Sequence, residues 1–290
     1  IFIILKLKES SIDIVHLNDG KMRNTWSLAA KILGKRIIFH QRTIFDSSKL
    51  SYLLLFTPEK IIAISDFVKK SLPHRFNAKT KVIYNPFISI NSSSKRDSKI
   101  IICKKLCLSD KNYILSFIGS VTNQKRPIIA IQTLEKLQQK GINAILLCIG
   151  KISPVNKKLL LDEAKRYNLE KSIKILGYKN NIELYLKGSD FIIAPAINEG
   201  FGRVLIEAML AKTVIVASNH GGHKEIIKNK INGILTKPNS PSSMAEAIKF
   251  LIDDKLQYKR IVKNAHKYAL KDFNVKNHLD SIIKIYLSNK

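Results

Sequence analysis

The chain has 290 residues, of which 45% are hydrophobic, and its mean hydropathy is close to zero. This length allows two ordinary domains, each with a buried core. No apolar run reaches the ~20 residues that a membrane-spanning helix needs, so the composition predicts a globular protein without a transmembrane segment.

The formal net charge is +28, which could indicate binding to nucleic acid or to an anionic membrane surface. The excess is spread along the chain, with 18 Lys or Arg against 7 Asp or Glu in residues 1–100 and 32 against 15 in the rest. Nucleic-acid binders usually concentrate their charge in one patch interleaved with aromatic residues. We therefore interpret the charge as a Lys- and Ile-rich composition, with attraction to anionic lipids or diphosphates as a consequence.

The chain begins at Ile1, and its first residues read like the interior of a fold, without the pattern of a secretory signal. We interpret this start as an N-terminal truncation. Three cysteines, Cys103, Cys107 and Cys148, are too few for a disulfide framework and have no His partner at zinc-site spacing. The sequence thus favours a reducing compartment.

Ile- and Val-rich runs alternate with amphipathic segments through the first hundred residues, as is typical of βαβ units in a parallel sheet. A helix over residues 24–33 ends before Gly34, and Ser65 is placed to cap the start of another. The predicted strands cover residues 12–16, 36–40, 60–64 and 81–84. These elements form part of a Rossmann-like sheet.

Residues 88–98 lose periodicity and gain serine, which predicts a connection between domains. A second βα series follows, and two helices without a strand between them, over residues 255–270 and 275–287, close the chain. Its predicted strands cover residues 113–119, 144–150, 173–176, 191–195, 214–217 and 233–235. We expect a partial first domain with its linker in residues 1–98, a complete second domain in 99–272, and a final helix in 273–290 that crosses back to the first domain.

The most informative stretch, N-E-G-F-G-R-V-L-I-E-A over residues 198–208, directly follows a predicted strand. A strand, a glycine-containing loop and a helix start can bind an anion with free backbone N–H groups and the helix dipole. Glu199 and Glu207 could accept hydrogen bonds from vicinal hydroxyls of a sugar or ribose. Alternatively, Glu199 caps the helix and Glu207 pairs with Arg203, and the two carboxylates alone favour this structural interpretation.

The stretch resembles the E-x7-E signature of family 4 glycosyltransferases, which have the GT-B fold. The match continues on both sides, through residues 175–178, Leu186, Asp190 and Pro195 upstream and through residues 208–209, Ala217, 221–222, Glu225, 232–233 and Phe273 downstream. The resemblance covers roughly residues 10–290. It implies an α/β protein with two Rossmann-like, doubly wound domains that face each other across a cleft, the first of them incomplete here.

By this resemblance, Glu207 binds the ribose hydroxyls of a nucleotide, and Glu199 holds the donor sugar. The backbone from Gly200 through Phe201 to Gly202 holds the donor diphosphate with Glu199. Gly177 and Tyr178 belong to the same donor-binding set.

A second candidate, residues 117–127, again combines a strand, a glycine turn and a helix start, with Pro127 in the first helical turn. Gly119 and Ser120 form the turn, and Lys125 could neutralise the growing charge of a leaving diphosphate without a metal ion. The family often has Arg after the glycine, where this chain has Ser120, so Arg126 could substitute. Without the resemblance, Lys125 would be read as a surface lysine.

His40 ends a predicted strand and resembles the histidine that faces the bound sugar in this family, where an imidazole can donate a hydrogen bond. Asn18 and Asp19 could line an acceptor cleft. His220 and His223 flank two glycines, but no third ligand accompanies them, so we predict no metal site.

These patterns predict a retaining glycosyltransferase that moves a sugar from a nucleotide diphosphate sugar to an acceptor hydroxyl, with Glu199, Lys125 and His40 as catalytic residues and no cofactor. The resemblance favours a saccharide or lipid-linked acceptor, cell-surface polysaccharide or glycolipid synthesis, and a cytoplasmic protein, peripheral at the inner face of the membrane. No nucleic-acid partner is expected. Two alternatives stay open: an inactive fragment that only binds a nucleotide, and a basic protein that binds nucleic acid or membrane surfaces.

Overall fold

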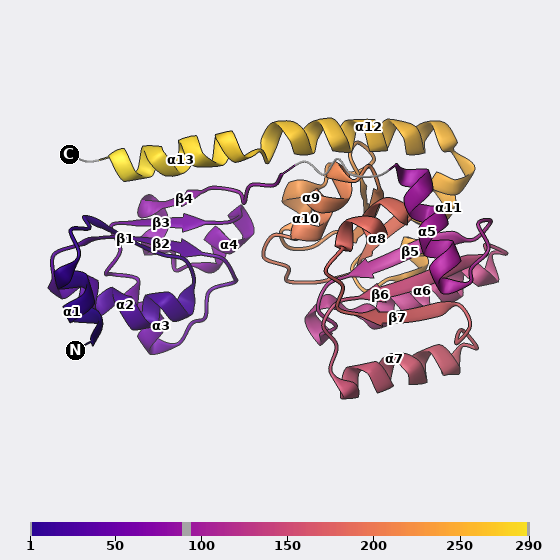
Figure 1. Cartoon of the computed structure of the whole chain (residues 1–290), viewed down its shortest axis with the longest axis horizontal. Helices are drawn as coiled ribbons and strands as arrows, with labels where there is room; N and C mark the ends of the chain where they lie inside the picture. The colour runs from indigo at the N-terminus through magenta and orange to yellow at the C-terminus, as the bar shows by residue number, and fades with distance from the viewer. Residues whose placement is uncertain (1, 89–93, 289–290) are drawn as a thin grey trace. The chain divides into compact units, whose positions relative to one another are not determined.

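The computed structural model describes residues 2–88 and 94–288, and its elements are shown in Figure 1. The chain divides into two compact units. One comprises Ile1–Pro86 with Phe273–Lys290, and the other comprises Phe87–Asp272. Among the described residues, none of the helices is both long and apolar enough to cross a bilayer.

The first unit contains a parallel four-stranded sheet in the order β1-β2-β3-β4. Its strands are β1 (Ile14–Leu17), β2 (Arg36–Gln41), β3 (Lys60–Ala63) and β4 (Thr80–Val82). Its helices are α1 (Phe2–Glu9), α2 (Gly20–Ile32), α3 (Lys49–Leu54), α4 (Asp66–Ser71), the 3₁₀ helix η1 (His74–Lys79) and α13 (Val275–Leu287). Each predicted strand of this region is confirmed within two residues.

Both faces of this sheet are buried, because successive side chains of a strand point to opposite sides. Ile37 and Phe39 of β2 pack into the core on one face, while Ile38 belongs to a cluster on the other. Ile282 and Ile285 of α13 complete that second cluster. The last helix of the chain therefore supplies part of the core of the first unit.

Polar contacts fix the same helix. The Arg36 guanidinium donates hydrogen bonds to the carbonyl oxygens of Tyr286, at 2.8 Å, and Ser288, at 3.0 Å, and it pairs with Glu59 at 2.8 Å. Nδ1 of His278 lies 2.8 Å from the carbonyl oxygen of Tyr84. The two Arg36 contacts satisfy carbonyl groups at the end of α13, which would otherwise lack partners.

The second unit is built on a parallel six-stranded sheet in the order β10-β9-β8-β5-β6-β7. Its strands are β5 (Tyr113–Ile118), β6 (Ala144–Ile149), β7 (Ile173–Gly177), β8 (Phe191–Ala194), β9 (Val214–Ser218) and β10 (Ile234–Thr236). From β5 the chain first builds the sheet towards β7, then returns to the other side of β5 and builds towards β10. The direction of winding thus reverses between β5 and β8, which makes a topological switch point.

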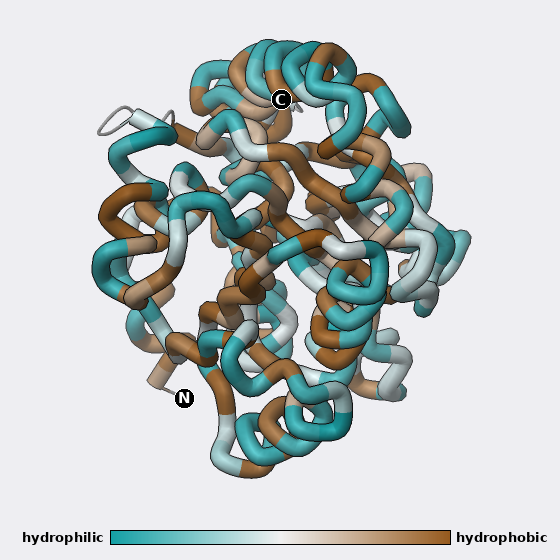
Figure 2. Tube along the Cα trace, turned by 90° about the vertical axis from the view of Figure 1, so that its right-hand side faces the viewer, coloured by the Kyte–Doolittle hydropathy of each residue, from teal (hydrophilic) through white to brown (hydrophobic). Residues whose placement is uncertain are grey.

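Helices cover both faces of this sheet, as Figure 1 shows. They are α5 (Lys95–Leu106), the 3₁₀ helix η2 (Asn123–Lys125), α6 (Pro127–Gln139), α7 (Pro154–Arg166), α8 (Ile182–Gly188), α9 (Arg203–Leu210), α10 (His223–Ile226), α11 (Pro241–Asp253) and α12 (Lys255–Asp272). All six residues of β6 are buried, as expected for a strand covered on both faces. Figure 2 accordingly shows hydrophobic segments in the interior and helices that alternate between hydrophilic and hydrophobic residues.

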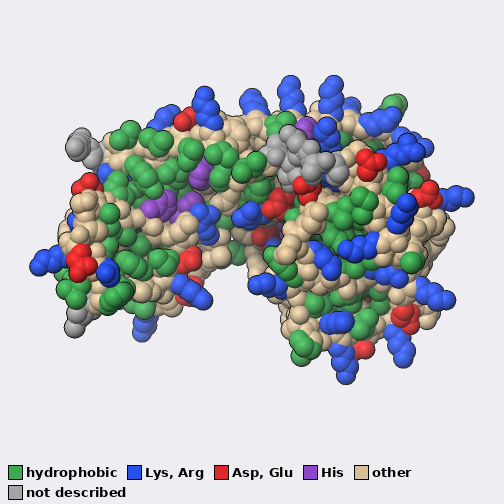
Figure 3. Space-filling model, viewed as in Figure 1, with side chains coloured by type: hydrophobic (Ala, Val, Ile, Leu, Met, Phe, Trp, Pro, Cys, Tyr) green, Lys and Arg blue, Asp and Glu red, His purple; other side chains and the backbone are tan. Residues whose placement is uncertain are grey.

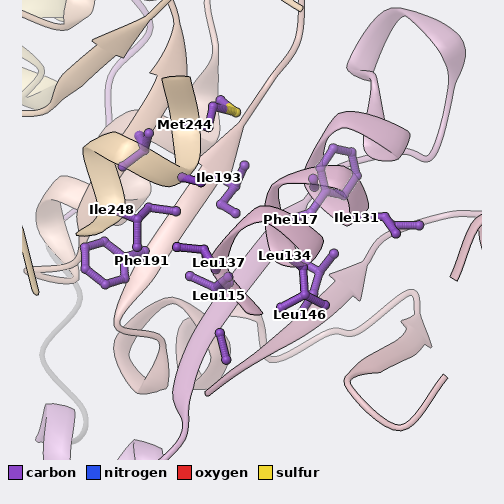
Figure 4. Close-up of a cluster of buried hydrophobic side chains, with 14 of the residues drawn as sticks. Leu115, Phe117, Ile131, Leu134, Leu137, Leu146, Phe191, Ile193, Met244 and Ile248 are labelled. Carbon is purple, nitrogen blue, oxygen red and sulfur yellow. The ribbon is translucent and has the colours of Figure 1, made fainter. Parts of the chain in front are cut away.

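The core of the second unit lies between the sheet and helices α6 and α11. Figure 4 shows Leu115, Phe117 and Ile193 of the strands among side chains of these two helices, including Leu134 and Ile248. Apolar side chains recur at helical spacing on the inner faces of α6 and α11, which is why these segments form amphipathic helices.

The predicted connection over residues 88–98 is wrong at its end, where α5 begins at Lys95. Ser94 caps this helix by accepting a hydrogen bond from the Asp97 N–H group, and Ser98 and Ile102 are buried. The first turn, K-R-D-S, carries no apolar periodicity, so the sequence pattern did not predict a helix there. Residues 89–93 of the predicted connection lie outside the described part of the chain.

Candidate active site

The candidate site lies at the carboxyl ends of β5 and β8, where the sheet reverses its winding. Open α/β sheets bind ligands in the crevice at such a switch point. The loops that follow the two strands are tied together: Nε2 of Gln124 donates to the carbonyl oxygen of Asn198 at 2.8 Å, and Lys125 forms an ion pair with Glu199. Residues 74 positions apart thereby share one edge of the sheet.

A pocket of about 380 Å³ opens between these loops. It is lined by Ile118, Gly119, Ser120, Lys125, Ile149, Gly150, Lys151, Tyr178, Lys179, Ile182, Glu199, Arg203, Val204 and Glu207. These residues end or follow strands β5, β6, β7 and β8, or they lie on α8 or α9. Four of the side chains are cationic and two are anionic, so the lining carries a net charge of +2 that suits a diphosphate.

The pocket wall depends on a close approach between the turns after β5 and β6. A Cβ atom at Gly150 would lie 2.0 Å from the carbonyl oxygen of Gly119, and Gly150 has a φ of +146°. Only glycine fits there. Gly221 approaches the loop after β8 in the same way, because its Cβ atom would lie 2.7 Å from the carbonyl oxygen of Glu199.

Glu199 and Lys125 form the centre of the pocket. The alternative prediction that Glu199 caps α9 is wrong, because Gly202 is the N-cap residue of that helix. The Glu199 carboxylate instead pairs with the Lys125 ammonium, and its carbonyl oxygen accepts the N–H of Gly222 at 2.8 Å. Both charged groups stay partly exposed, at 16% for Glu199 and 30% for Lys125, so a ligand can reach them.

Glu207 lies one turn inside α9 and is 25% exposed. Its predicted i, i+4 pair with Arg203 is confirmed, with 3.6 Å between Oε1 and Nη2. Burial raises the pKa of Glu207, and the neighbouring Arg203 guanidinium lowers it to a smaller extent. Partial burial of the ionised carboxylate therefore costs free energy. A ligand hydroxyl group that donates a hydrogen bond to the carboxylate would stabilise its ionised form.

The structure brings six of the predicted donor-binding residues together in this pocket: Gly119, Ser120, Lys125, Tyr178, Glu199 and Glu207. Others lie elsewhere. Gly177 is the last residue of β7, the Phe201 ring is buried and stacks on Phe87, and Gly200 and Gly202 continue the loop into α9. Arg126 lines a separate pocket of about 390 Å³ between α6 and α7, away from Ser120.

Comparison with known proteins identifies the family. The family model described as glycosyl transferases group 1 matches residues 98–268, which is more than half of the chain. The chain belongs to this family. Its fold is the GT-B fold of two Rossmann-like domains, as predicted, since a crystal structure of HepE from Anabaena in complex with UDP and glucose superposes with a TM-score of 0.85. That match is 22% identical in sequence and covers 99% of this chain and 81% of the other.

Two curated relatives extend the comparison. An uncharacterised glycosyltransferase of Methanocaldococcus jannaschii is 29% identical over 254 residues, covering 83% of this chain and 64% of that protein. The UDP-Gal:α-D-GlcNAc-diphosphoundecaprenol α-1,3-galactosyltransferase of Escherichia coli is 23% identical over 305 residues, covering 97% of this chain and 76% of that protein. The chain thus spans less than two thirds of the first of these relatives.

In this group 1 glycosyltransferase, the predicted catalytic residue His40 lies on β2 in the first unit. It is buried, and its ring stacks on that of His16 with 5.7 Å between centroids. Burial, together with the nearby positive charge of Arg42, lowers the pKa of His40 to about 3. The imidazole is therefore neutral at physiological pH and can either donate or accept a hydrogen bond.

The residues predicted for an acceptor cleft have local partners. Asn18 accepts hydrogen bonds from the Arg42 guanidinium, the shorter at 2.7 Å. Asp19 is the N-cap residue of α2 and accepts from the N–H of Met22 at 2.8 Å. Asp19 thus serves the start of a helix in this structure.

His220 and His223 each have a structural partner in the glycosyltransferase. Nδ1 of His220 accepts the N–H of Asn198 at 3.1 Å, and buried His223 contacts Ser218. Burial lowers the pKa of His223 to about 4. Across residues 2–88 and 94–288, no three His, Cys, Asp or Glu side chains gather as a metal site would require, and metal-independence stays a prediction.

Lys151 and Lys179 were missed by the sequence analysis, although both line the pocket. Each follows a strand closely, since β6 ends at Ile149 and β7 at Gly177. A systematic search for polar residues just past the carboxyl ends of the predicted strands would have found them.

Proposed function

We propose that the protein transfers a glycosyl group from a nucleotide diphosphate sugar to an acceptor hydroxyl with retention of configuration. The observation that carries this proposal is the meeting of Glu199, Glu207 and Lys125 in one pocket at the switch point. Family membership supports the reaction class, and the pocket supplies the chemical groups that a sugar diphosphate needs.

The donor fits the pocket by charge and by hydrogen-bonding capacity. In this proposal Glu207 accepts hydrogen bonds from the ribose hydroxyls, and Glu199 accepts them from the donor sugar. Lys125, Lys151 and Lys179 offer ammonium groups to the diphosphate. A uridine donor is the first candidate, since UDP is bound in the crystal structure of Anabaena HepE and UDP-Gal is the donor in the name of the Escherichia coli relative.

In the proposed reaction the bond between the anomeric carbon and the diphosphate oxygen breaks, and the acceptor oxygen bonds to that carbon on the same face. The nucleoside diphosphate leaves with the electron pair of the broken bond, and one of its phosphate oxygens takes the hydroxyl proton of the acceptor. Negative charge grows on the leaving group, where the Lys125 ammonium and the N–H groups at the start of α9 stabilise it. His40 is the proposed partner of the donor sugar from the first domain.

The acceptor is proposed to be a saccharide or a lipid-linked saccharide, in the synthesis of a cell-surface polysaccharide or glycolipid. A relative in Campylobacter jejuni, 28% identical over 198 residues, is named for a diphospho-undecaprenol acceptor, as is the Escherichia coli relative. The reaction would take place in the cytoplasm, at the inner face of the membrane, and would need no cofactor.

Titration with UDP-glucose and UDP-galactose tests the donor site. Glu207→Gln should weaken binding by roughly 10- to 100-fold, because a hydrogen bond to a charged group contributes about 1.5–3 kcal/mol. The matched control is Glu170→Gln, which changes an exposed carboxylate in the segment before β7 and should leave affinity unchanged. Equal affinities of the wild type and Glu207→Gln for every nucleotide sugar would refute the site.

A turnover assay beside the titration separates the proposal from its two alternatives. Release of UDP that depends on an added acceptor supports transfer, whereas binding without release identifies a nucleotide-binding fragment. Salt-sensitive binding of a polyanion that Glu207→Gln leaves unchanged, without binding of any nucleotide sugar, identifies a basic surface-binding protein.

A further inference from the structure

Helix α12 carries a lysine at every fourth position over its whole length: Lys255, Lys259, Lys263, Lys267 and Lys271. Successive members are rotated by about 40° around a helix of 3.6 residues per turn, so Lys259, Lys263 and Lys267 project from one side. The opposite side is buried through Ile261, Ala265 and Ala269. The lysines thus form a ladder on the outer face of the helix.

The ladder works against the stability of the isolated helix. Like charges four residues apart on a helix repel each other. The carboxylate of Asp254, just before the helix, accepts the N–H of Gln257 at 2.9 Å, but within α12 itself the only acidic residue is Asp272 at its end. Such a cost is expected where the charge serves to bind something outside the helix.

Three of these lysines border an apolar groove of about 590 Å³. Tyr258, Val262 and Leu270 contribute its floor, and Leu270 is 43% exposed. Lys212, exposed in the turn after α9, borders the groove from the other side. The lining includes no Asp or Glu side chain.

Four of the five lysines that line the groove have ammonium groups available to a ligand, whereas Lys95 donates hydrogen bonds to Lys187, Ser189 and Thr213 within the fold. Within the described residues, Lys212, Lys259, Lys263 and Lys267 have neither an ion-pair partner nor a hydrogen-bonded side chain. Figure 3 shows Lys and Arg side chains standing out along the upper edge of the view, where Figure 1 draws α12. A cationic rim around an apolar floor complements an anionic amphiphile.

We propose that this groove, defined by Lys212, Lys259, Lys263, Lys267 and its apolar floor, docks the protein on the surface of an anionic phospholipid bilayer. Lipid phosphates would lie between the ammonium groups, and the upper part of a lipid chain would lie on Val262 and Leu270. All these residues belong to the second unit, so the surface is complete within one domain. The proposal concerns binding alone and holds whether or not the proposed transfer occurs.

The groove suits lipid better than nucleic acid, because single-stranded nucleic acid is bound by stacking bases on aromatic faces. Tyr258 and His266 are the aromatic residues of the lining, and Nδ1 of His266 lies 3.3 Å from the carbonyl oxygen of Met209. The Tyr258 ring packs edge-on against Phe191, with 5.7 Å between centroids and 87° between planes. Its hydroxyl donates to the carbonyl oxygen of Asp190 at 3.0 Å. The ring therefore already has its partners inside the fold.

Sedimentation of the full chain with vesicles tests the proposal. Vesicles of phosphatidylcholine with about one third phosphatidylglycerol should bind the wild type at low salt, and pure phosphatidylcholine should not. The triple variant Lys259→Gln/Lys263→Gln/Lys267→Gln should bind the anionic vesicles roughly 100-fold more weakly, at about fivefold per lysine. Leu270→Asn should weaken binding by about threefold, through loss of apolar contact.

The matched control is Lys157→Gln/Lys158→Gln/Lys165→Gln, which removes the same charge from exposed positions on α7. It should reduce binding by less than about fivefold, because only long-range attraction is lost. If thermal unfolding shows that the first triple variant is destabilised, the double variant Lys263→Gln/Lys267→Gln replaces it, with roughly 25-fold weaker binding expected.

Three outcomes would overturn the proposal. The first is failure of the wild type to bind anionic vesicles. The second is an equal loss of affinity in the two triple variants, which would show that only net charge matters. The third is that vesicles stay unbound while a single-stranded polynucleotide binds, with an affinity that depends on Lys259, Lys263 and Lys267. That result would assign the groove to nucleic acid.

Discussion

Replacement of Ile285 by alanine should destabilise the first unit, because α13 supplies part of its core. Ile285 is 5% exposed and packs with Ile38, Ile62 and Ile83 of the sheet. Truncating a buried Ile to Ala costs about 2–5 kcal/mol, and alanine returns about 0.4 kcal/mol through its higher helix propensity. We expect a loss of about 3 kcal/mol in the free energy of unfolding.

The matched control lies two residues away on the same helix. Ile283 is 47% exposed, so Ile283→Ala removes the same atoms from a surface that water already reaches and should change stability by less than about 0.5 kcal/mol. Deletion of the chain from Asn277 onwards removes Ile282 and Ile285, the two isoleucines that α13 gives to the cluster, and the carbonyl partners of Arg36. It should destabilise the unit more than Ile285→Ala does.

Denaturant unfolding followed by circular dichroism measures the total loss, and amide hydrogen exchange locates it. Ile285→Ala should reduce protection of the β2 and β3 amides, since their opening free energy includes the contact with α13. For a domain of about 100 residues, each kcal/mol corresponds to roughly 4–8 °C in Tm. Equal effects of Ile285→Ala and Ile283→Ala would refute the assignment of the buried face of α13.

Three further predictions follow from the structure. Gly150→Ala should cost about 2 kcal/mol or more in thermal unfolding and abolish nucleotide-sugar binding, because its Cβ would meet the neighbouring turn at 2.0 Å, whereas Gly20→Ala, with 4.0 Å of space, should be tolerated. Burial lowers the pKa of His40 to about 3, so the unfolded state binds its proton first. The free energy of unfolding should therefore fall as the pH drops below about 6.5, by about 2 kcal/mol at pH ~5. The variant His40→Gln should remove this part of the pH dependence, whereas His74→Gln, at an exposed position, should leave it unchanged. Lys125→Met should lower kcat by roughly 10²- to 10³-fold in the turnover assay, and an unchanged kcat would exclude it as the group that stabilises the leaving diphosphate.

The strands could be predicted from the sequence because buried parallel strands read as continuous hydrophobic runs. The runs A-I-L-L-C-I of β6 and V-I-V-A-S of β9 are short and lie between helical segments. A run of that length is too short for a helix, so the sequence predicts a buried strand. The start of α5 could not be predicted in this way. Its first turn is polar, and the helix is held by the Ser94 cap and by the ion pair between Lys99 and Asp190, the residue before β8, at 2.8 Å.

The candidate site could be predicted only in part, for a related reason. Glu199 and Glu207 belong to a contiguous motif, which a sequence displays directly. Lys151 and Lys179 enter the pocket because β6 lies beside β5 and β7 lies beside β6, and the order of strands in a sheet is a tertiary property. The ion pair between Lys125 and Glu199 likewise depends on the adjacency of β5 and β8.

The distribution of cations in the pocket bears on the serine at position 120. The planar fork of an arginine at this position could bind a phosphate through two parallel hydrogen bonds. Here Arg126 lines a different pocket, while Lys151 and Lys179 stand with Lys125 around the proposed diphosphate position. Ammonium groups act as point charges with freely oriented donors, so they stabilise negative charge without fixing the geometry of the phosphate. If the proposed transfer occurs, the fixed geometry has to come from the backbone N–H groups at the glycine turns. For that reason the close approach at Gly150 should matter more to binding than any one of the three lysines.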